Sequence, residues 1–359
     1  MEERVTLEKR RRELSESYRK PTLAFGRLAR SIAPIAFDVP APDDVFDQWA
    51  SDLEDPSSLY GEPESASIET SAAVAGPGTR EYIVRFQSPS EHVDPTAYAR
   101  VYEPVAGDES LPTMIFHSGL GMMNDSLPYW PEEEYIGRNL APQGIRVILP
   151  EAPWSGRREL SGSYSGEPYL AHAPVGLFQS YGAAVQETAI LTAWARQRGA
   201  PRVGLGGMSL GGIVTAFVIG HAGRWPEGMR PDAAFPVAFS TEIVRLLQES
   251  TITELLEVTS AVREAGWNGN TLSKLTPLLR APSTPGIAPG DIYPFAGIND
   301  DATLYKHAES TLDEWDVPDA NRTVWPTDHF GVYFHALRGD EIQRRMIREM
   351  TGQASDGAE

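Results

Sequence analysis

The feature that most constrains the fold is a glycine-rich segment in the middle of the chain, Val203-Gly-Leu-Gly-Gly-Met-Ser-Leu-Gly-Gly-Ile213. Its residue types predict a short apolar strand, a tight turn and the start of a helix. Glycine has no Cβ, so it permits unusual backbone angles and a close approach of a strand to a helix. The segment therefore predicts a strained strand-to-helix turn with Ser209 at its apex.

The rest of the chain predicts the sheet to which this turn belongs. Residues 82–86 and 98–102 alternate apolar and polar side chains, which is typical of antiparallel strands with one solvent-exposed face. Later strands are short, apolar and separated by helix-length stretches, as in a parallel sheet covered on both faces; they are expected at 113–117, 145–149, 203–205, 234–239, 292–296 and 322–325. We predict an α/β fold with a mostly parallel eight-stranded sheet and helices on both faces.

The chain is expected to have three parts. Residues 1–78 predict a helical N-terminal arm and an irregular linker, 79–350 the α/β domain, and 351–359 a disordered tail. Within the domain, residues 241–290 form a helical insertion after the sixth strand and are a candidate cap. In the arm, four apolar residues form a stripe that runs beside basic residues. The stripe consists of Phe25, Leu28, Ile32 and Ile35. This pattern favours an arm packed on the domain over a helix that contacts a membrane surface or a partner.

Composition excludes several classes of protein. The 359 residues contain 31 Lys and Arg against 50 Asp and Glu, a net charge of −19, which argues against a nucleic-acid partner. The chain has no cysteine, so disulfides, zinc–thiolate sites and a cysteine nucleophile are excluded. We expect no cofactor and no metal. The charged N-terminus lacks an apolar signal region, and no apolar run approaches the ~18 residues of a membrane span, so a cytoplasmic location is expected.

The segment Gly207-Met-Ser-Leu-Gly211 fits the pattern G-x-S-x-G, in which a serine nucleophile lies on a strand-to-helix turn. A serine hydroxyl needs an imidazole to take its proton and a carboxylate to orient that imidazole, and in this pattern they follow in the order serine, acid, histidine. His329, expected in the loop after the last strand, is the predicted base. Asp300 is the predicted acid, with Asp301 as the alternative.

Acyl transfer also needs two backbone N–H donors for the developing oxyanion. One is expected at Leu210, and the other at Gly119 or Leu120 in the loop after the third strand. His117 at the start of that loop is interpreted as structural. The long loop after the fourth strand is either a wall of the substrate pocket or a packed surface loop. The candidate pocket residues are Trp154, Arg158, Tyr164 and, beside the nucleophile, Met208.

Taken together, these features resemble the α/β-hydrolase-fold serine hydrolases over residues of about 80 to 350. More narrowly, the chain resembles the α/β-hydrolase domain-containing protein 18 family through the following features: an acid-x-Pro-aromatic-x-Gly-x-Arg segment at 151–158, Glu187 on a helix, a glycine after the turn motif, Ser240-Thr241, and a histidine in the last loop. The resemblance implies an intracellular esterase- or lipase-like hydrolase, but the substrate does not transfer with it. We separately expect cleavage of a small-molecule carboxylic ester through an acyl-enzyme. Two departures, the absence of an H-G dipeptide at His117 and an Asp before His329, leave the oxyanion donor and the pocket shape open.

Other functions are compatible with parts of this pattern. Thioester, amide and carbon–carbon bonds are cleaved by the same three side chains, and a non-catalytic binding protein could keep the fold. The segment 204–209 differs at one position from the dinucleotide-binding pattern G-x-G-x-x-G. In that pattern an acidic residue ends the next strand, whereas Glu227 and Asp232 precede the next strand here. A nucleotide-dependent oxidoreductase is therefore the remote alternative.

Overall fold

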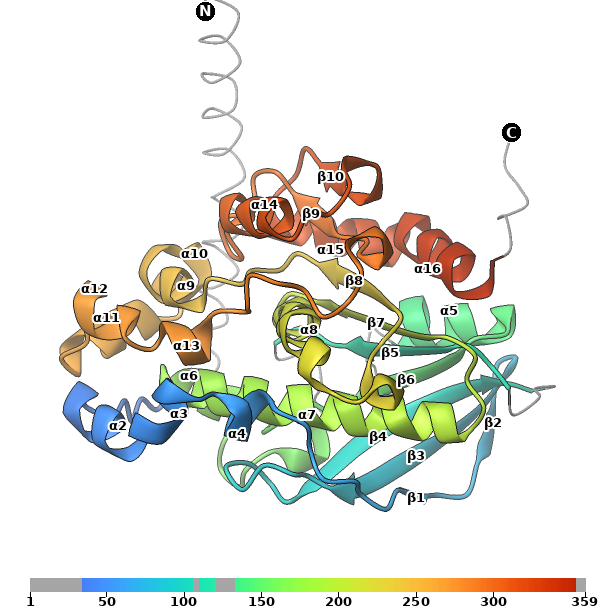
Figure 1. Ribbon diagram of the computed structural model, residues 1–359, viewed down its shortest axis with the longest axis horizontal. Coiled ribbons are helices and arrows are strands. Elements are labelled where there is room, and N and C mark those ends of the chain that lie inside the picture. The colour runs from blue at the N-terminus through green and yellow to red at the C-terminus, as the bar shows by residue number, and fades with distance from the viewer. Residues whose placement is uncertain (1–33, 106–109, 121–132, 353–359) are drawn as a thin grey trace, which may run out of the picture.

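A computed structural model describes residues 34–105, 110–120 and 133–352 of the 359-residue chain. The predicted tail from 353 onward and most of the apolar stripe of the N-terminal arm lie outside these ranges. The described chain forms one ten-stranded sheet (Figure 1). Its strands are β1 (Glu69–Thr70), β2 (Val74–Gly76), β3 (Thr79–Gln87), β4 (Thr96–Pro104), β5 (Thr113–His117), β6 (Arg146–Pro150), β7 (Val203–Met208), β8 (Ala233–Val237), β9 (Phe295–Gly297) and β10 (Thr323–Trp325).

The expected count of eight strands was too low. Strands β3 to β10 correspond to the eight predicted segments, and β1 and β2 add two short antiparallel pairings with β3. Both lie in the polar and glycine-containing linker, and each has only two or three residues, most of them exposed. Segments this short carry no measurable alternation of apolar and polar residues, which is why the sequence did not reveal them.

The strand order is β1-β3-β4-β6-β5-β7-β8-β9-β10, with β2 beside β3. Strand β3 pairs antiparallel with β1 and β4, and β4 pairs antiparallel with β6. All pairings from β6 through β5, β7, β8 and β9 to β10 are parallel. The carboxyl ends of β5, β7, β8, β9 and β10 therefore meet at one edge of the sheet, and the segments that follow these strands lie close together there.

Helices cover both faces of the sheet. They are α2 (Pro42–Gln48), α3 (Ala50–Glu54), α4 (Ser57–Tyr60), α5 (Arg138–Leu140), α6 (Glu167–Ala171), α7 (Val175–Gln197), α8 (Leu210–His221), α9 (Ile243–Glu249), α10 (Thr251–Leu255), α11 (Val258–Glu264), α12 (Gly269–Ser273), α13 (Thr276–Leu279), α14 (Tyr305–Glu314), α15 (His329–Arg338) and α16 (Glu341–Thr351). Helices α7 and α8 pack on one face, and α5, α15 and α16 on the other.

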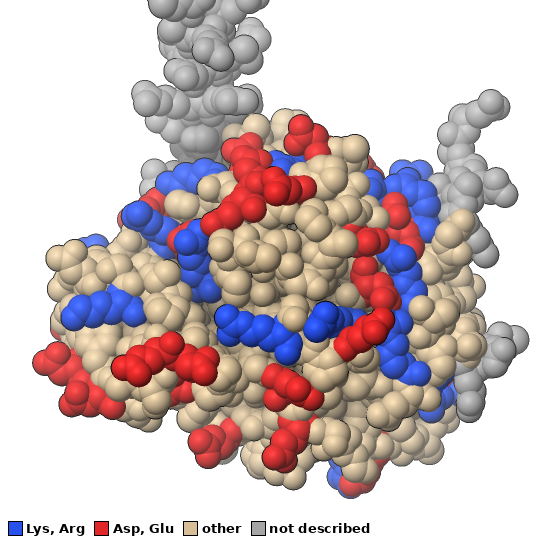
Figure 2. Space-filling model, viewed as in Figure 1, with Lys and Arg blue, Asp and Glu red and all other residues tan. Residues whose placement is uncertain are grey.

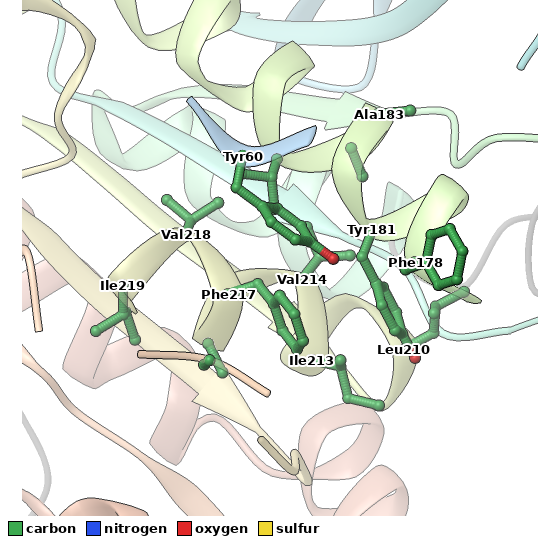
Figure 3. Close-up of a cluster of buried hydrophobic side chains, with 14 of the residues drawn as sticks. Tyr60, Phe178, Tyr181, Ala183, Leu210, Ile213, Val214, Phe217, Val218 and Ile219 are labelled. Carbon is green, nitrogen blue, oxygen red and sulfur yellow. The ribbon is translucent and has the colours of Figure 1, made fainter. Parts of the chain in front are cut away.

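The central strands are apolar throughout because both of their faces are buried. In β5, Ile115 contacts the core on the side of α7 and α8, whereas Met114 and Phe116 contact the core on the opposite side. Between α7 and α8, the rings of Tyr181 and Phe217 stack with their centroids 5.1 Å apart (Figure 3). Burying a side chain of this size contributes roughly 1.5–3 kcal/mol, so this two-sided core fixes the helix that follows Ser209.

Five helices, α9 to α13, lie between β8 and β9, and Figure 1 shows them gathered at one end of the molecule beside α2 and α3. The N-terminal segment is tied to these helices by side-chain contacts. The indole of Trp267 donates to the carbonyl of Pro40 at 2.8 Å, and its ring meets the ring of Phe46 edge-on. The hydroxyl of Tyr60 donates to the carbonyl of Leu278 at 2.7 Å. The described part of the arm thus packs on the domain.

Charged side chains of both signs are interspersed on the face shown in Figure 2. Several form ion pairs at the surface; Arg280, for example, lies 2.7 Å from Glu242 and 3.0 Å from Glu314. Partly exposed pairs of this kind contribute about 0–1 kcal/mol each. The stability of the fold therefore depends mainly on the two-sided apolar core and on the few ion pairs inside it.

One of these interior ion pairs joins the loop after β6 to α7. The guanidinium of Arg158 makes two hydrogen bonds of 2.9 Å to the carboxylate of Glu187, and both side chains are at least 97% buried. Arg158 also donates to the carbonyl of Glu151 at 3.1 Å, and the hydroxyl of Ser88 donates to Glu187 at 2.6 Å. The loop is thereby fixed to the long helix by a buried, bidentate salt bridge.

We expect Arg158→Met to lower the free energy of unfolding by about 3–5 kcal/mol, because it leaves the carboxylate of Glu187 buried without its cation. Adding Glu187→Leu should recover most of this loss, since the second change removes the uncompensated charge. Urea unfolding followed by circular dichroism measures both effects. A single variant that loses less than about 1 kcal/mol would show that the pair contributes little.

Candidate active site

Ser209 lies in the turn between β7 and α8, at the carboxyl edge of the sheet. Its backbone angles, φ 55° and ψ −113°, are rarely adopted by a residue with a side chain. Two glycines make the turn possible: a Cβ on Gly207 would lie 2.2 Å from the carbonyl oxygen of Gly211, and a Cβ on Gly211 would lie 2.1 Å from that of His117. The close contact of β5, β7 and α8 thus requires glycine at both motif positions.

The structure brings Ser209, His329 and Asp300 together from three distant parts of the chain. The Oγ of Ser209 lies 3.0 Å from Nε2 of His329, and Nδ1 of His329 lies 2.8 Å from Oδ2 of Asp300. With Nδ1–H donating to the carboxylate, Nε2 carries the lone pair that can accept the serine proton. The geometry is that of a nucleophile, a base and an orienting acid.

The carboxylate of Asp300 is held by its own loop. Its Oδ1 accepts hydrogen bonds from the N–H groups of Ala302 and Thr303 at 2.9 and 2.8 Å, and its Oδ2 accepts one from the hydroxyl of Thr303 at 2.7 Å. Burial raises the pKa of Asp300, but the nearby His329 and these hydrogen bonds lower it more, so the net pKa lies below its ordinary value. Asp300 is therefore ionised and oriented.

The alternative acid, Asp301, points elsewhere. Its Oδ1 accepts a hydrogen bond from the hydroxyl of Thr251 at 3.0 Å, while the imidazole is bonded by Asp300. Asp328, adjacent to the histidine, caps α15 by accepting from the N–H of Gly331 at 2.8 Å. His329 itself is the first residue of α15 and not part of the preceding loop as predicted, because this cap starts the helix at His329.

Burial lowers the pKa of His329, but three carboxylates oppose this effect. The largest contribution comes from Asp300, with smaller ones from Asp328 and Asp301, and the net pKa is raised above its ordinary value. The neutral imidazole, which alone can accept a proton at Nε2, is thus the form present at pH values above this raised pKa.

The candidate oxyanion donors lie beside the serine. Leu210 is the first residue of α8, where the helix leaves its first N–H groups without intrahelical acceptors. Gly119 and Leu120 lie two and three residues after the end of β5, which pairs with β7, and Leu120 lines the same cavity as Ser209. A helix N-terminus next to the nucleophile favours developing negative charge.

His117, at the end of β5, is buried and bonded to α7. Its Nε2 lies 2.8 Å from the hydroxyl of Thr188, which itself donates to the carbonyl of Ala184 at 2.6 Å, so the histidine is the donor. Burial lowers the pKa of His117 to about 3. A neutral imidazole that joins β5 to α7 is what the structural interpretation of His117 predicted.

A cavity of about 80 Å³ opens at Ser209 and His329, and its lining is almost wholly apolar. Much of the lining comes from the helices between β8 and β9: Ile243, Leu246 and Leu247 of α9, Ile252 and Thr253 of α10, and Val258 of α11. The remaining apolar lining comes from Leu120, Tyr169, Leu170, Leu177, Leu210 and Ile213. The sequence indicated the insertion but not these residues, since apolar side chains in short helices are also typical of a core.

The four predicted pocket residues are not part of this lining. Arg158 is engaged with Glu187, and Trp154 is buried in the core. Met208 points to the opposite face of the sheet, as expected from strand alternation, because Leu205 of the same strand packs on the side of α8. Tyr164 lies in the loop before α6, where its N–H donates to Glu167 at 3.3 Å. The loop after β6 acts mainly as a packed support, and the lining residues of this region, Tyr169 and Leu170, belong to the helix α6 that follows it.

The described ranges contain no cluster of three or more His, Asp or Glu side chains arranged to hold a metal ion. No helix of the described chain has the length and apolar character needed to cross a membrane.

We expect the pKa of His329 to lie above 6.5, the ordinary value for histidine, because the attraction of Asp300, Asp328 and Asp301 for the imidazolium together outweighs burial. NMR titration of the imidazole measures this pKa. Asp300→Asn should lower it, since the main stabilising charge is removed. Asp319→Asn, which changes a fully exposed carboxylate, should leave it unaltered. A pKa at or below 6.5, or no response to Asp300→Asn, would contradict this electrostatic account.

A scan against protein-family models finds no match to this chain, and a comparison with curated proteins finds none either. Solved structures do match. An acetyl xylan esterase from Paenibacillus sp. R4 aligns with a TM-score of 0.56 at 14% identity, over 88% of this chain and 97% of the other. A candidate hydrolase from Legionella pneumophila aligns with a TM-score of 0.52 at 12% identity, over 84% and 96%. At such identities the likeness concerns the fold, which is a mostly parallel α/β fold of the α/β-hydrolase type.

Proposed function

We propose that this protein is a serine hydrolase that cleaves small carboxylic esters through an acyl-enzyme on Ser209. The observation that carries the proposal is the continuous hydrogen-bonded series from Ser209 Oγ to His329 Nε2, at 3.0 Å, and from His329 Nδ1 to Asp300 Oδ2, at 2.8 Å. Ser209, at one end of this series, lies on a strained turn and lines a cavity, two features that a purely structural hydrogen bond would not need.

In the proposed mechanism, His329 takes the proton of Ser209 as its Oγ attacks the ester carbonyl. The ionised Asp300 keeps the proton on Nδ1 and stabilises the imidazolium that forms. The N–H of Leu210, together with that of Gly119 or Leu120, stabilises the oxyanion. His329 then protonates the leaving alcohol and, as base again, activates the water that hydrolyses the acyl-enzyme. Because each attack requires neutral His329, the rate should fall as the pH drops through its raised pKa.

The cavity supports a small apolar acyl group as the substrate class. Its ~80 Å³ is well below the about 300–1,000 Å³ of pockets for drug-sized ligands, and its lining offers few polar partners. The Paenibacillus protein with the same fold is an acetyl xylan esterase, and we carry over from it only the short acyl ester. A thioester, amide or carbon–carbon bond is a weaker candidate, because no residue of the cavity favours it.

We further propose that residues 241–290 act as a cap. Helices α9, α10 and α11 supply the largest continuous part of the cavity wall, so they shield the ester from water. We also propose a relation to the α/β-hydrolase domain-containing protein 18 family on the basis of the shared sequence markers. Two of these markers, the segment 151–158 and Glu187, contact each other through Arg158.

Replacing the nucleophile tests the proposal. We expect Ser209→Ala to lower the turnover of p-nitrophenyl butyrate by at least about 10³-fold, because no other group replaces the attacking oxygen. Labelling by a fluorophosphonate should be lost as well. The exposed helix variant Ser310→Ala is the control and should keep both properties. Unchanged turnover in a folded Ser209→Ala protein, checked by circular dichroism, would refute the assignment.

A further inference from the structure

The loop that carries the acid is bonded to the helices of the cap. Ser250 ends α9 and caps α10, and its hydroxyl donates to the carbonyl of Ala302 at 2.6 Å. The N–H of Thr251 donates to the carbonyl of Asp301 at 3.1 Å, and its hydroxyl donates to the carboxylate of Asp301 at 3.0 Å. Ser250 and Thr251 are 98% and 93% buried, so water competes little for these three hydrogen bonds.

The same loop residues hold the acid on their other side. Ala302 donates its N–H to Asp300 while its carbonyl accepts from Ser250, and the next residue, Thr303, donates to both carboxylate oxygens of Asp300. One peptide segment thus connects the α9–α10 junction to the carboxylate that orients His329. A displacement of the junction would be transmitted to the acid through two or three hydrogen bonds.

The junction and the acid loop also form adjoining parts of the cavity wall. Ser250, Ile252 and Thr253 line it from the cap, and Ala302 and Thr303 line it from the loop. A group bound in the cavity therefore contacts both partners of this hydrogen-bonded connection.

We propose that Ser250 and Thr251 are positioning residues, which fix the Asp300 loop to the cap so that the acyl pocket and the acid–histidine pair form one rigid unit. This inference rests on the proposed function, since it assigns a role in the same reaction. It explains why Asp301, which does not bond the imidazole, follows the acid: Asp301 anchors the loop to Thr251. Neither side chain is hydrogen-bonded to Ser209 or His329, and both bond the loop that carries Asp300, so both act through Asp300.

Thr251→Val removes the hydroxyl and nearly preserves the shape of the side chain. Without the bond to Asp301, the loop should hold Asp300 less firmly against His329. We expect kcat for p-nitrophenyl butyrate to fall about tenfold with little change in KM, because the cavity lining is retained. Three carboxylates raise the pKa of His329: those of Asp300, Asp301 and Asp328. In Thr251→Val this pKa should fall toward its ordinary value. Thr251→Ser, which keeps the hydroxyl, should restore both properties.

The matched control is Thr259→Val in α11. The hydroxyl of Thr259 donates to the carbonyl of Leu247 at 2.9 Å and lies 3.1 Å from the hydroxyl of Thr253, so its loss weakens the cap without touching the acid loop. This variant should keep the wild-type kcat and the wild-type titration of His329, even where its stability falls as much as that of Thr251→Val.

The two readouts separate this inference from the proposed function. NMR titration of His329 needs no substrate, so it tests the positioning role even in a protein without esterase activity. Absence of ester turnover in the wild type would refute the proposed function alone. A wild-type His329 titration in Thr251→Val, or equal losses in Thr251→Val and Thr259→Val, would overturn the positioning role.

Discussion

The site depends on the close contact between the first turn of α8 and the ends of β5 and β7. At Gly207 and Gly211 the backbones approach so closely that a methyl group would lie little more than 2 Å from a carbonyl oxygen. This contact holds Ser209 at a positive φ and turns its hydroxyl toward His329. The strain is supported by the apolar core beneath, where α8 packs against both the sheet and α7.

Around this fixed serine, each polar group is oriented by a second one. Asp300 orients His329, the N–H groups of Ala302 and Thr303 orient Asp300, and the segment that joins α9 to α10 holds that loop through Ser250 and Thr251. Such successive support keeps side chains within the few tenths of an ångström that proton transfer requires. The buried pair of Arg158 and Glu187 has the corresponding role for the loop after β6, which it attaches to α7.

The sequence was most informative where chemistry restricts the residue type. The motif around Ser209, the parallel strand pattern and the order of serine, acid and histidine are each legible locally, and the structure brings the three predicted side chains together. The choice between Asp300 and Asp301 required the fold, because adjacent carboxylates differ only in direction. Pocket residues could not be predicted: Met208 adjoins Ser209 in the sequence and Trp154 follows β6, but both side chains are directed into the core. The true lining comes from apolar residues of short helices, which have no distinctive pattern.

The central claim is that Ser209 is acylated during turnover, and trapping that intermediate tests it most directly. Protein mixed rapidly with p-nitrophenyl butyrate and quenched in acid can be digested and analysed by mass spectrometry. The account predicts one butyryl group per chain, on the peptide that contains Ser209 and on that serine. An acyl group on another residue, or ester hydrolysis with no acylated protein at any quench time, would contradict it.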